Sequence, residues 1–315
     1  MTAGLKIKDG EFVRAVSGFR NWVTPDGEAG PSGEGGFAAE PDRYHLYVSY
    51  ACPWAHRALI LRALKKLEDV ISVSVVHPLM PEESWVFGEY PGATEDHLYG
   101  SKHLYELYHK AEPGFDGLVT VPVLWDKQRE TIVNNESAEI IRMLNSAFDR
   151  YGDASLDFYP GELRAEIDAI NEQVYAKVNN GVYRAGFARS QKAYERAYEK
   201  LFETLDALEA RLAKQRYLAG DRITEADWRL FTTLVRFDAV YYGHFKTNKK
   251  RLVDYPNLWG YTRELYQLPG IAETVNMDHI KTHYYGSHPW INPSRIVPLG
   301  PEIDFEAAHG RDSIR

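Results

Sequence analysis

The chain contains a single cysteine, Cys52, in the segment Tyr50-Ala51-Cys52-Pro53-Trp54-Ala55-His56-Arg57. Proline is favoured at the first position of a helix, so Pro53 predicts a helix that begins directly after Cys52. The amide donors and the positive dipole end of a helix stabilise an anion there, and they lower a thiol pKa from about 8.5 to about 3.5–7.5. An isolated cysteine is more commonly a buried structural residue. The position of Cys52 before Pro53 favours the reactive thiolate.

The cysteine count also restricts the chemistry. A redox pair of the C-x-x-C type is excluded because Ala55 occupies the position of the second thiol. No internal disulfide can form, so a disulfide at Cys52 must be released by a thiol from outside the chain, and glutathione is the obvious supplier. Chains without disulfides are typical of reducing compartments. We therefore expect monothiol chemistry in a cytoplasmic protein.

Alternating strand and helix patterns surround Cys52 in the first half of the chain. An aromatic and β-branched run over 44–50 predicts a strand, an apolar stripe after Pro53 predicts a helix, and 70–76 predicts a second strand. A long polar and aromatic insertion follows over 80–117. A further β-rich run, Val119 to Trp125, is interrupted by Pro122, and another helix is predicted to open near Ser137.

The second half of the chain shows only helical periodicity. Apolar residues are spaced by three or four in two long segments: Leu163, Ile167, Ile170, Val174 and Val178, then Leu201, Leu205, Leu208 and Leu212. Thr224 and Asp227 resemble a capping box. The tail from Pro289 onward is predicted to run over the surface as an extended arm. Strands followed by helices predict an α+β domain and then an all-α domain. The predicted parts are an N-terminal extension (1–42), an α+β domain (43–150), an all-helical domain (160–288) and a C-terminal arm (289–315).

Composition and charge exclude several classes of protein. The 315 residues are 44% hydrophobic and 26% charged, which is near the globular average. The 37 Lys and Arg residues against 45 Asp and Glu residues give 37 − 45 = −8, so the cationic footprint of a nucleic-acid-binding protein is missing. No stretch approaches the roughly 20 apolar residues of a membrane-spanning helix. We expect neither a nucleic-acid partner nor a membrane association.

Several motifs resemble one known family. Cys52-Pro53-Trp54, the run from Thr120 to Leu124, and Asn135-Glu136-Ser137-Ala138, ahead of an all-helical second half, are similar to the cysteine-type glutathione transferases. Three stretches, the first of which extends Cys52-Pro53-Trp54, resemble more closely the Xi class, the glutathionyl-hydroquinone reductases. They are Cys-Pro-Trp-Ala-His-Arg, Asn179-Asn180-Gly181-Val182-Tyr183, and the region from Leu268 to Tyr285. The resemblance spans nearly the whole chain.

This resemblance implies a thioredoxin-like domain with glutathione along the edge of its sheet. Pro122 is then a cis proline, and the Val121 backbone pairs with the cysteine moiety of glutathione as an added strand does. Glu136 holds the γ-glutamyl ammonium, and Ser137 holds its carboxylate. Trp85 packs on glutathione and borders the substrate. Ordinary helix capping is the alternative interpretation of Glu136 and Ser137, and core packing is the alternative for Trp85.

The helical domain is then expected to supply the pocket for an electrophilic substrate. The resemblance places Tyr183, Tyr241 and Tyr284 at the substrate site, and it implies acid–base roles for Tyr183 and Tyr284. Packing is the alternative for any one of the 21 tyrosines. His283 and His288 lack the spacing of a metal motif, so no metal is expected.

The expected activity is reduction of S-glutathionyl-hydroquinones to hydroquinones through a mixed disulfide between Cys52 and glutathione, with release of oxidised glutathione. The first alternative is an omega-like thiol transferase or dehydroascorbate reductase, which uses the same thiolate. The second is a non-catalytic binding module of the transferase fold, which does not need Cys52. As partners we expect glutathione, a glutathionyl-hydroquinone, and a second copy of the chain in a homodimer.

Overall fold

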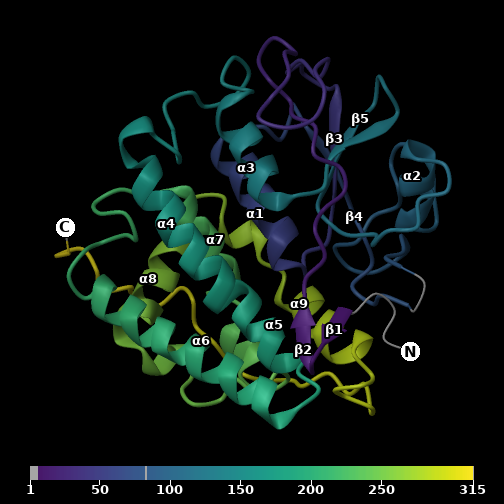
Figure 1. Cartoon of the computed structure of the whole chain (residues 1–315). Helices are drawn as coiled ribbons and strands as arrows, with labels where there is room; N and C mark the ends of the chain where they lie inside the picture. Colours follow the sequence, from purple (N-terminus) through teal and green to yellow (C-terminus); the bar gives the residue numbers. More distant parts are fainter. Residues whose placement is uncertain (1–5, 82–83, 315) are drawn as a thin grey trace. The chain divides into compact units, whose positions relative to one another are not determined.

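The computed structural model describes residues 6–81 and 84–314. Its described residues form two compact units (Figure 1). The first unit contains Ala15–Asp157 and Glu273–His283. The second contains Phe158–Ala272 together with 6–14 and 284–314. The domain limits predicted from the sequence stay a prediction.

The first unit is built on a four-stranded mixed sheet. Its strands are β3 (Tyr44–Val48), β4 (Ser72–Val75), β5 (Val123–Asp126) and β6 (Thr131–Asn134), in the order β4-β3-β5-β6. β3 pairs parallel to β4 and antiparallel to β5, and β5 pairs antiparallel to β6. This small mixed sheet is the thioredoxin-like domain that the resemblance implies. The predicted run at Val119 starts as a strand only at Val123, because Pro122 lacks the amide proton that a ladder needs.

Two helices of the first unit, α1 (Pro53–Leu64) and α3 (Ser137–Ser146), lie side by side (Figure 1). They bury apolar residues such as Ile60 and Ile141. The predicted helix after Pro53 and the predicted helix at Ser137 are both confirmed. The long insertion contains a helix that the sequence did not indicate, α2 (Leu104–Ala111), which begins with a capping box between His103 and Glu106.

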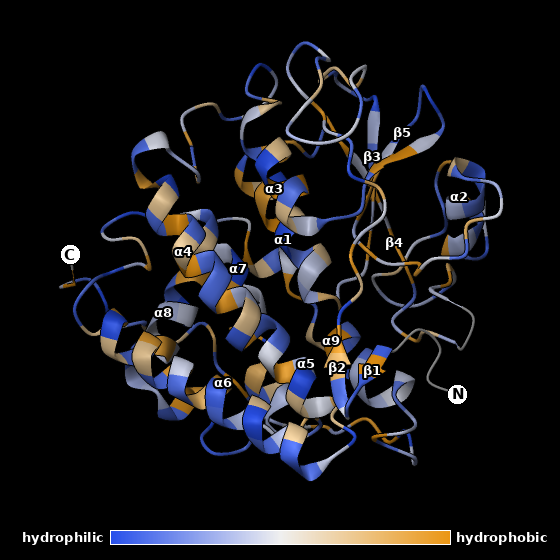
Figure 2. Ribbon diagram, viewed as in Figure 1, coloured by the Kyte–Doolittle hydropathy of each residue, from blue (hydrophilic) through white to orange (hydrophobic). Residues whose placement is uncertain are grey.

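The second unit is mainly helical, and it also contains two π-helical segments and two short 3-10 turns. Its described α-helices are α4 (Arg164–Val174), α5 (Asn180–Gly186), α6 (Gln191–Leu212), α7 (Glu225–Leu234) and α8 (Pro256–Tyr266). The π segments are Tyr175–Asn179 and Phe237–Tyr241, and the 3-10 turns are Gly161–Leu163 and Leu252–Asp254. A further 3-10 turn, Ala272–Thr274, has residues in both units. The last helix, α9 (Met277–Ser287), has residues in both units. Figure 2 shows hydrophilic and hydrophobic residues interleaved along α6, as its apolar stripe predicted.

The predicted capping box at the start of α7 is present. The Thr224 amide and hydroxyl donate to the Asp227 carboxylate at 2.7 and 3.0 Å. Asp227 also accepts from the Leu218 amide at 2.9 Å and from the Tyr261 hydroxyl at 2.8 Å, and it is fully buried. One carboxylate therefore starts α7 and ties it to α8.

A short hairpin precedes the irregular loop of the N-terminal extension. β1 (Lys6–Lys8) pairs antiparallel with β2 (Glu11–Val13). The two connecting residues, Asp9 and Gly10, have φ values of 51° and 79°. Asp-Gly in this left-handed region is the preferred two-residue hairpin turn.

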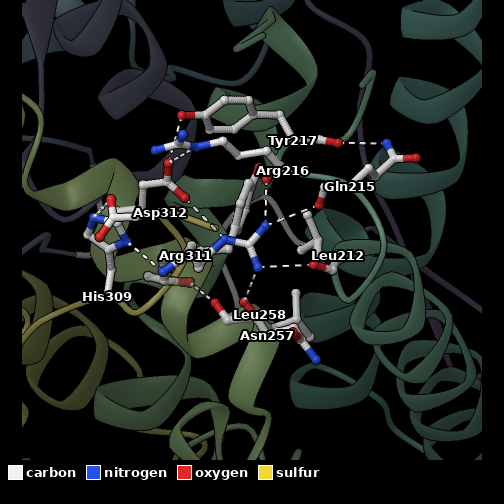
Figure 3. Close-up of polar contacts among 12 residues, drawn as sticks. Leu212, Gln215, Arg216, Tyr217, Asn257, Leu258, His309, Arg311 and Asp312 are labelled. Carbon is white, nitrogen blue, oxygen red and sulfur yellow. Dashed lines mark hydrogen bonds and ion pairs between the residues drawn. The ribbon is translucent and has the colours of Figure 1, made fainter. Parts of the chain in front are cut away.

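The C-terminal arm differs in part from its prediction. Ile296 and Leu299 are exposed, as expected of an arm on the surface, but Phe305 and Arg311 are buried. The Arg311 guanidinium donates to Glu264 at 3.1 Å and to four backbone carbonyls (Figure 3); they belong to Leu212, Gln215, Arg216 and Asn257. The end of the arm is therefore part of the second unit's core.

None of the helices in residues 6–81 and 84–314 is long and apolar enough to cross a membrane.

Candidate active site

Cys52 occupies the N-cap of α1, with Pro53 at the first helical position. Its backbone is extended, with φ −77° and ψ 118°, and its carbonyl accepts the His56 amide at 3.0 Å. Its thiol donates to the Val121 carbonyl at 3.5 Å and is only partly buried. The sulfur therefore lies at the positive end of a helix and within reach of an external reactant, which are the two conditions for a reactive thiolate.

The segment that faces Cys52 is Val121-Pro122, and its peptide bond is cis. A buried tyrosine holds this segment from behind: the Tyr108 hydroxyl donates to the Thr120 carbonyl at 2.8 Å and accepts from the Thr120 amide at 3.2 Å. The Asn135 amide group also donates to the Tyr108 hydroxyl at 3.1 Å. The backbone before Pro122 is thus fixed beside Cys52 through a phenol on the inserted helix α2.

Glu136 and Ser137 stand at the start of α3. Glu136 is the N-cap residue, and its Oε1 accepts from the Ala138 amide at 3.1 Å. Its Oε2 accepts from the Ser17 hydroxyl at 3.1 Å. Glu136 therefore does cap α3, as the alternative interpretation holds. These contacts do not use all the acceptor positions of the carboxylate, because its two oxygens offer about four. A ligand ammonium therefore has acceptor positions at Glu136.

Trp85 is buried at 7% exposure in the inserted segment, and its ring stacks on the His283 imidazole with centroids 4.8 Å apart and planes inclined by 18°. A hydrogen bond of 2.9 Å joins His283 Nδ1 to the Pro78 carbonyl. Because that carbonyl can only accept, Nδ1 carries the proton. The histidine thus has a structural role here, and the indole is held in one orientation.

The second unit brings the three predicted tyrosines together. The hydroxyls of Tyr183 and Tyr284 are 2.5 Å apart, and those of Tyr241 and Tyr284 are 3.0 Å apart. Tyr284 is therefore the centre of a chain of three phenols. Burial and the two neighbouring phenols raise the pKa of Tyr284 well above its usual range, although Arg236 opposes the shift. Tyr284 stays protonated at neutral pH.

Sequence reasoning missed two residues that contact Glu136 and Ser137, the side chains expected to hold glutathione. Arg57 is 1% exposed, its guanidinium lies over the Trp54 ring at 4.5 Å, and it donates to the Ser137 hydroxyl at 3.4 Å. The sequence did carry a signal for Arg57, because a charged residue among the apolar residues of a helix needs a partner. Ser17, which holds Glu136, carries no such signal in the sequence.

Within residues 6–81 and 84–314, no cluster of three or more His, Cys, Asp or Glu side chains could hold a metal ion.

Comparison with known proteins shows the family to which the chain belongs. Residues 51–147 match the glutathione S-transferase N-terminal domain, and residues 191–264 match the glutathione S-transferase C-terminal domain. The chain is 59% identical to glutathionyl-hydroquinone reductase YqjG of Escherichia coli, over 98% of this chain and 94% of that protein. It is 52% identical to glutathionyl-hydroquinone reductase PcpF of Sphingobium chlorophenolicum, over 94% and 91%.

Solved structures give the same result. The glutathione-bound structure of YqjG superposes with a TM-score of 0.93 at 60% identity and covers 94% of this chain and 96% of that chain. The Xi-class glutathione transferase from Natrialba magadii superposes with a TM-score of 0.90 at 54% identity, over 94% and 89%. The chain belongs to the Xi class of the glutathione S-transferase family.

Proposed function

We propose that this protein is a glutathionyl-hydroquinone reductase that works through a mixed disulfide at Cys52. One observation carries the proposal: the chain's single thiol belongs to the N-cap residue of α1 and donates to the backbone carbonyl of Val121, beside the cis Pro122. That arrangement presents a thiolate next to a backbone edge with which a peptide can pair. Glutathione is a peptide whose own sulfur lies at its middle residue, so pairing there brings sulfur to sulfur.

Four further groups hold glutathione in this proposal. Glu136 binds the ammonium of the γ-glutamyl group, and the Ser137 hydroxyl and amide bind its carboxylate at the N-terminus of α3. Val121 pairs with the backbone of the cysteine moiety, and Trp85 packs against the bound peptide. Arg57 helps to position Ser137, because its guanidinium donates a hydrogen bond to the Ser137 hydroxyl.

The reaction proceeds in two displacements. The Cys52 thiolate attacks the sulfur of the glutathionyl thioether, an S–S bond forms, and the bond between sulfur and the ring carbon breaks. The electron pair stays on the ring carbon, which takes up a proton and leaves as the hydroquinone. A second glutathione then attacks the mixed disulfide, gives up its thiol proton, and releases oxidised glutathione and the Cys52 thiolate. The ring carbon is reduced and the two glutathione sulfurs are oxidised.

Tyr183 and Tyr284 supply the acid function in this proposal, and Tyr241 belongs to the same substrate-binding group. A protonated phenol can donate to the ring carbon as its bond to sulfur breaks. The hydroxyl chain supports this role, because Tyr284 can pass a hydrogen bond to Tyr183 as negative charge develops there.

Turnover with two kinds of substrate tests the activity against the omega-like alternative. We expect the wild type with free glutathione to release hydroquinone and oxidised glutathione in equal amounts from a glutathionyl-hydroquinone. Cys52→Ser should lack this activity, because serine gives neither a thiolate nor the disulfide intermediate. Turnover of dehydroascorbate and a simple mixed disulfide, without release of hydroquinone, would instead favour the omega-like thiol transferase. No glutathione chemistry on any of the three substrates would favour a binding module.

We also propose that the protein is a cytoplasmic homodimer. A single thiol and the absence of internal disulfides support the reducing compartment. Light scattering of the purified chain should give twice its mass of 36.0 kDa.

A further inference from the structure

The residue that follows the N-terminal hairpin, Arg14, places a cation on the phenol chain of the second unit. β2 lies against α5 (Figure 1), and its Phe12 packs edge to face on Phe187 with centroids 5.4 Å apart. Beyond the end of β2, the Arg14 guanidinium lies 4.9 Å from the centroid of the Tyr183 ring. Arg14 Nε also donates to the Asn180 side-chain oxygen at 2.6 Å. The cation is therefore held over the ring by a second, directional contact.

The hairpin itself is anchored to the same unit. The Arg189 amide donates to the Gly10 carbonyl at 2.9 Å, and an ion pair joins Arg196 to Glu11. Gly10 packs so closely on Ser190 that a Cβ at this position would lie 2.6 Å from the serine hydroxyl. Because the turn is fixed at this end, the two-residue Asp9-Gly10 connection also fixes the register of β2 and hence the place of Arg14.

Tyr183 is the member of the phenol chain on which such a cation has most effect. It is 9% exposed, whereas Tyr284 is 1% and Tyr241 0% exposed, so Tyr183 is the most accessible residue of the three. If Tyr241 donates to Tyr284 and Tyr284 donates to Tyr183, the Tyr183 oxygen accepts the last hydrogen bond of the phenol chain. A cation over an aromatic face is attracted to it, and the attraction grows when the ring becomes negatively charged.

We propose that Arg14 is a positioning residue of the substrate site. Its guanidinium holds the Tyr183 ring in line with the Tyr284 hydroxyl, and it stabilises the negative charge that Tyr183 carries after it gives its proton to the ring carbon. The proton that restores Tyr183 comes from the thiol of the second glutathione. This inference rests on the proposed function, and it gives the N-terminal extension a part in the reaction.

The test compares Arg14→Met with Arg14→Lys. The methionine variant keeps an unbranched side chain without the charge, and the lysine variant keeps a charge without the guanidinium fork. We expect Arg14→Met to slow hydroquinone release in single-turnover experiments by roughly 3- to 30-fold, the range of a partly desolvated cation–π contact. Arg14→Lys should recover much of that loss. Turnover of a small glutathione mixed disulfide, which needs no proton on a ring carbon, should be retained in both variants and reports that they are folded.

A matched control and a double variant separate electrostatics from packing. Arg164 also lies over a tyrosine ring, 5.1 Å from Tyr159 on the same unit, so Arg164→Met should leave both activities unchanged. If Arg14 acts through Tyr183, the combined Arg14→Met and Tyr183→Phe variant should be no slower than Tyr183→Phe alone.

Three results would overturn this role of Arg14. They are additive losses of rate in the double variant, equal losses of rate on both substrates in Arg14→Met, and a wild-type rate of hydroquinone release in Arg14→Met. A wild type that releases no hydroquinone would overturn the proposed function and this inference together. A wild type that does release it, with an unaltered Arg14→Met, would overturn the inference alone.

Discussion

At the scale of single residues, the proposed chemistry divides between one thiol and three phenols. Reduction of a disulfide asks for a thiolate at Cys52 and a sulfur leaving group. Cleavage of the bond between sulfur and an aryl carbon asks in addition for a proton on that carbon. We propose that the phenol chain around Tyr284, with its short contact to Tyr183, supplies this proton.

Removal of a single hydroxyl from the phenol chain should therefore affect the two reactions differently. We expect Tyr183→Phe and Tyr284→Phe to slow glutathionyl-hydroquinone turnover by about 10²–10⁴-fold, the usual range of general acid help. Turnover of a small mixed disulfide should change little, so the ratio of the two rates is the measurement.

Tyr285→Phe is the matched control for these variants. Its hydroxyl donates to the Ala239 carbonyl at 3.3 Å, apart from the phenol chain, and the ratio should stay at the wild-type value. If both rates fell together in folded Tyr183→Phe and Tyr284→Phe proteins, the tyrosines would be packing residues.

At the scale of elements, the C-terminal arm is fastened to the helical unit by Arg311. The guanidinium and Glu264 are 2% and 4% exposed and 3.1 Å apart. Glu264 also accepts from Arg216 and from Tyr217, at 2.6 and 2.8 Å (Figure 3 shows the surrounding contacts). Loss of the guanidinium leaves a buried carboxylate with one cation fewer.

We predict that Arg311→Ala lowers the free energy of unfolding by about 3–5 kcal/mol, the cost of breaking a buried ion pair from one side. Arg311→Lys should lie between this variant and the wild type, because lysine cannot serve five acceptors at once. Urea unfolding of the purified variants measures these differences.

Arg251→Ala provides the control for Arg311. Its ion pair with Asp254 is exposed, with side chains 56% and 37% accessible, so its loss should lower the free energy of unfolding far less than the loss of Arg311 does. An Arg311→Ala protein no less stable than this control would show that the arm contributes little to the fold.

Elements with local signals were predictable from the sequence, and elements fixed by distant contacts were not. Pro53 marks the start of α1, and Thr224 with Asp227 marks the start of α7, because caps are short-range patterns. Arg14 and Arg311 stand in segments without helical period, and the side chains that accept their hydrogen bonds, Asn180 and Glu264, are more than 40 residues away in the chain. No local rule finds such contacts.

The predicted site shows the same division. The resemblance named Tyr183, Tyr241 and Tyr284 one by one, whereas the structure shows that they form one hydrogen-bonded chain with Tyr284 at its centre. Similarly, the capping contact of Glu136 was foreseen as an alternative, but its second contact, to Ser17, depends on how the irregular N-terminal segment folds back.

At the scale of the whole molecule, the family relationship extends over nearly the full chain, and the catalytic proposal depends on both units. The first unit contains Cys52 and the residues proposed to hold glutathione, and the second contains the three tyrosines and Arg14. The net charge of −8 gives no basis for a polyanionic partner. The proposed activity therefore depends on whether one small aromatic thioether reacts at Cys52.

A single turnover without free glutathione tests this claim most directly. Wild-type protein mixed with excess glutathionyl-hydroquinone should release one equivalent of hydroquinone per chain and then stop, since no second thiol is present to resolve the disulfide. Mass spectrometry of the same sample should show one glutathione on Cys52. Hydroquinone released without this adduct, or released equally by Cys52→Ser, would contradict the mechanism.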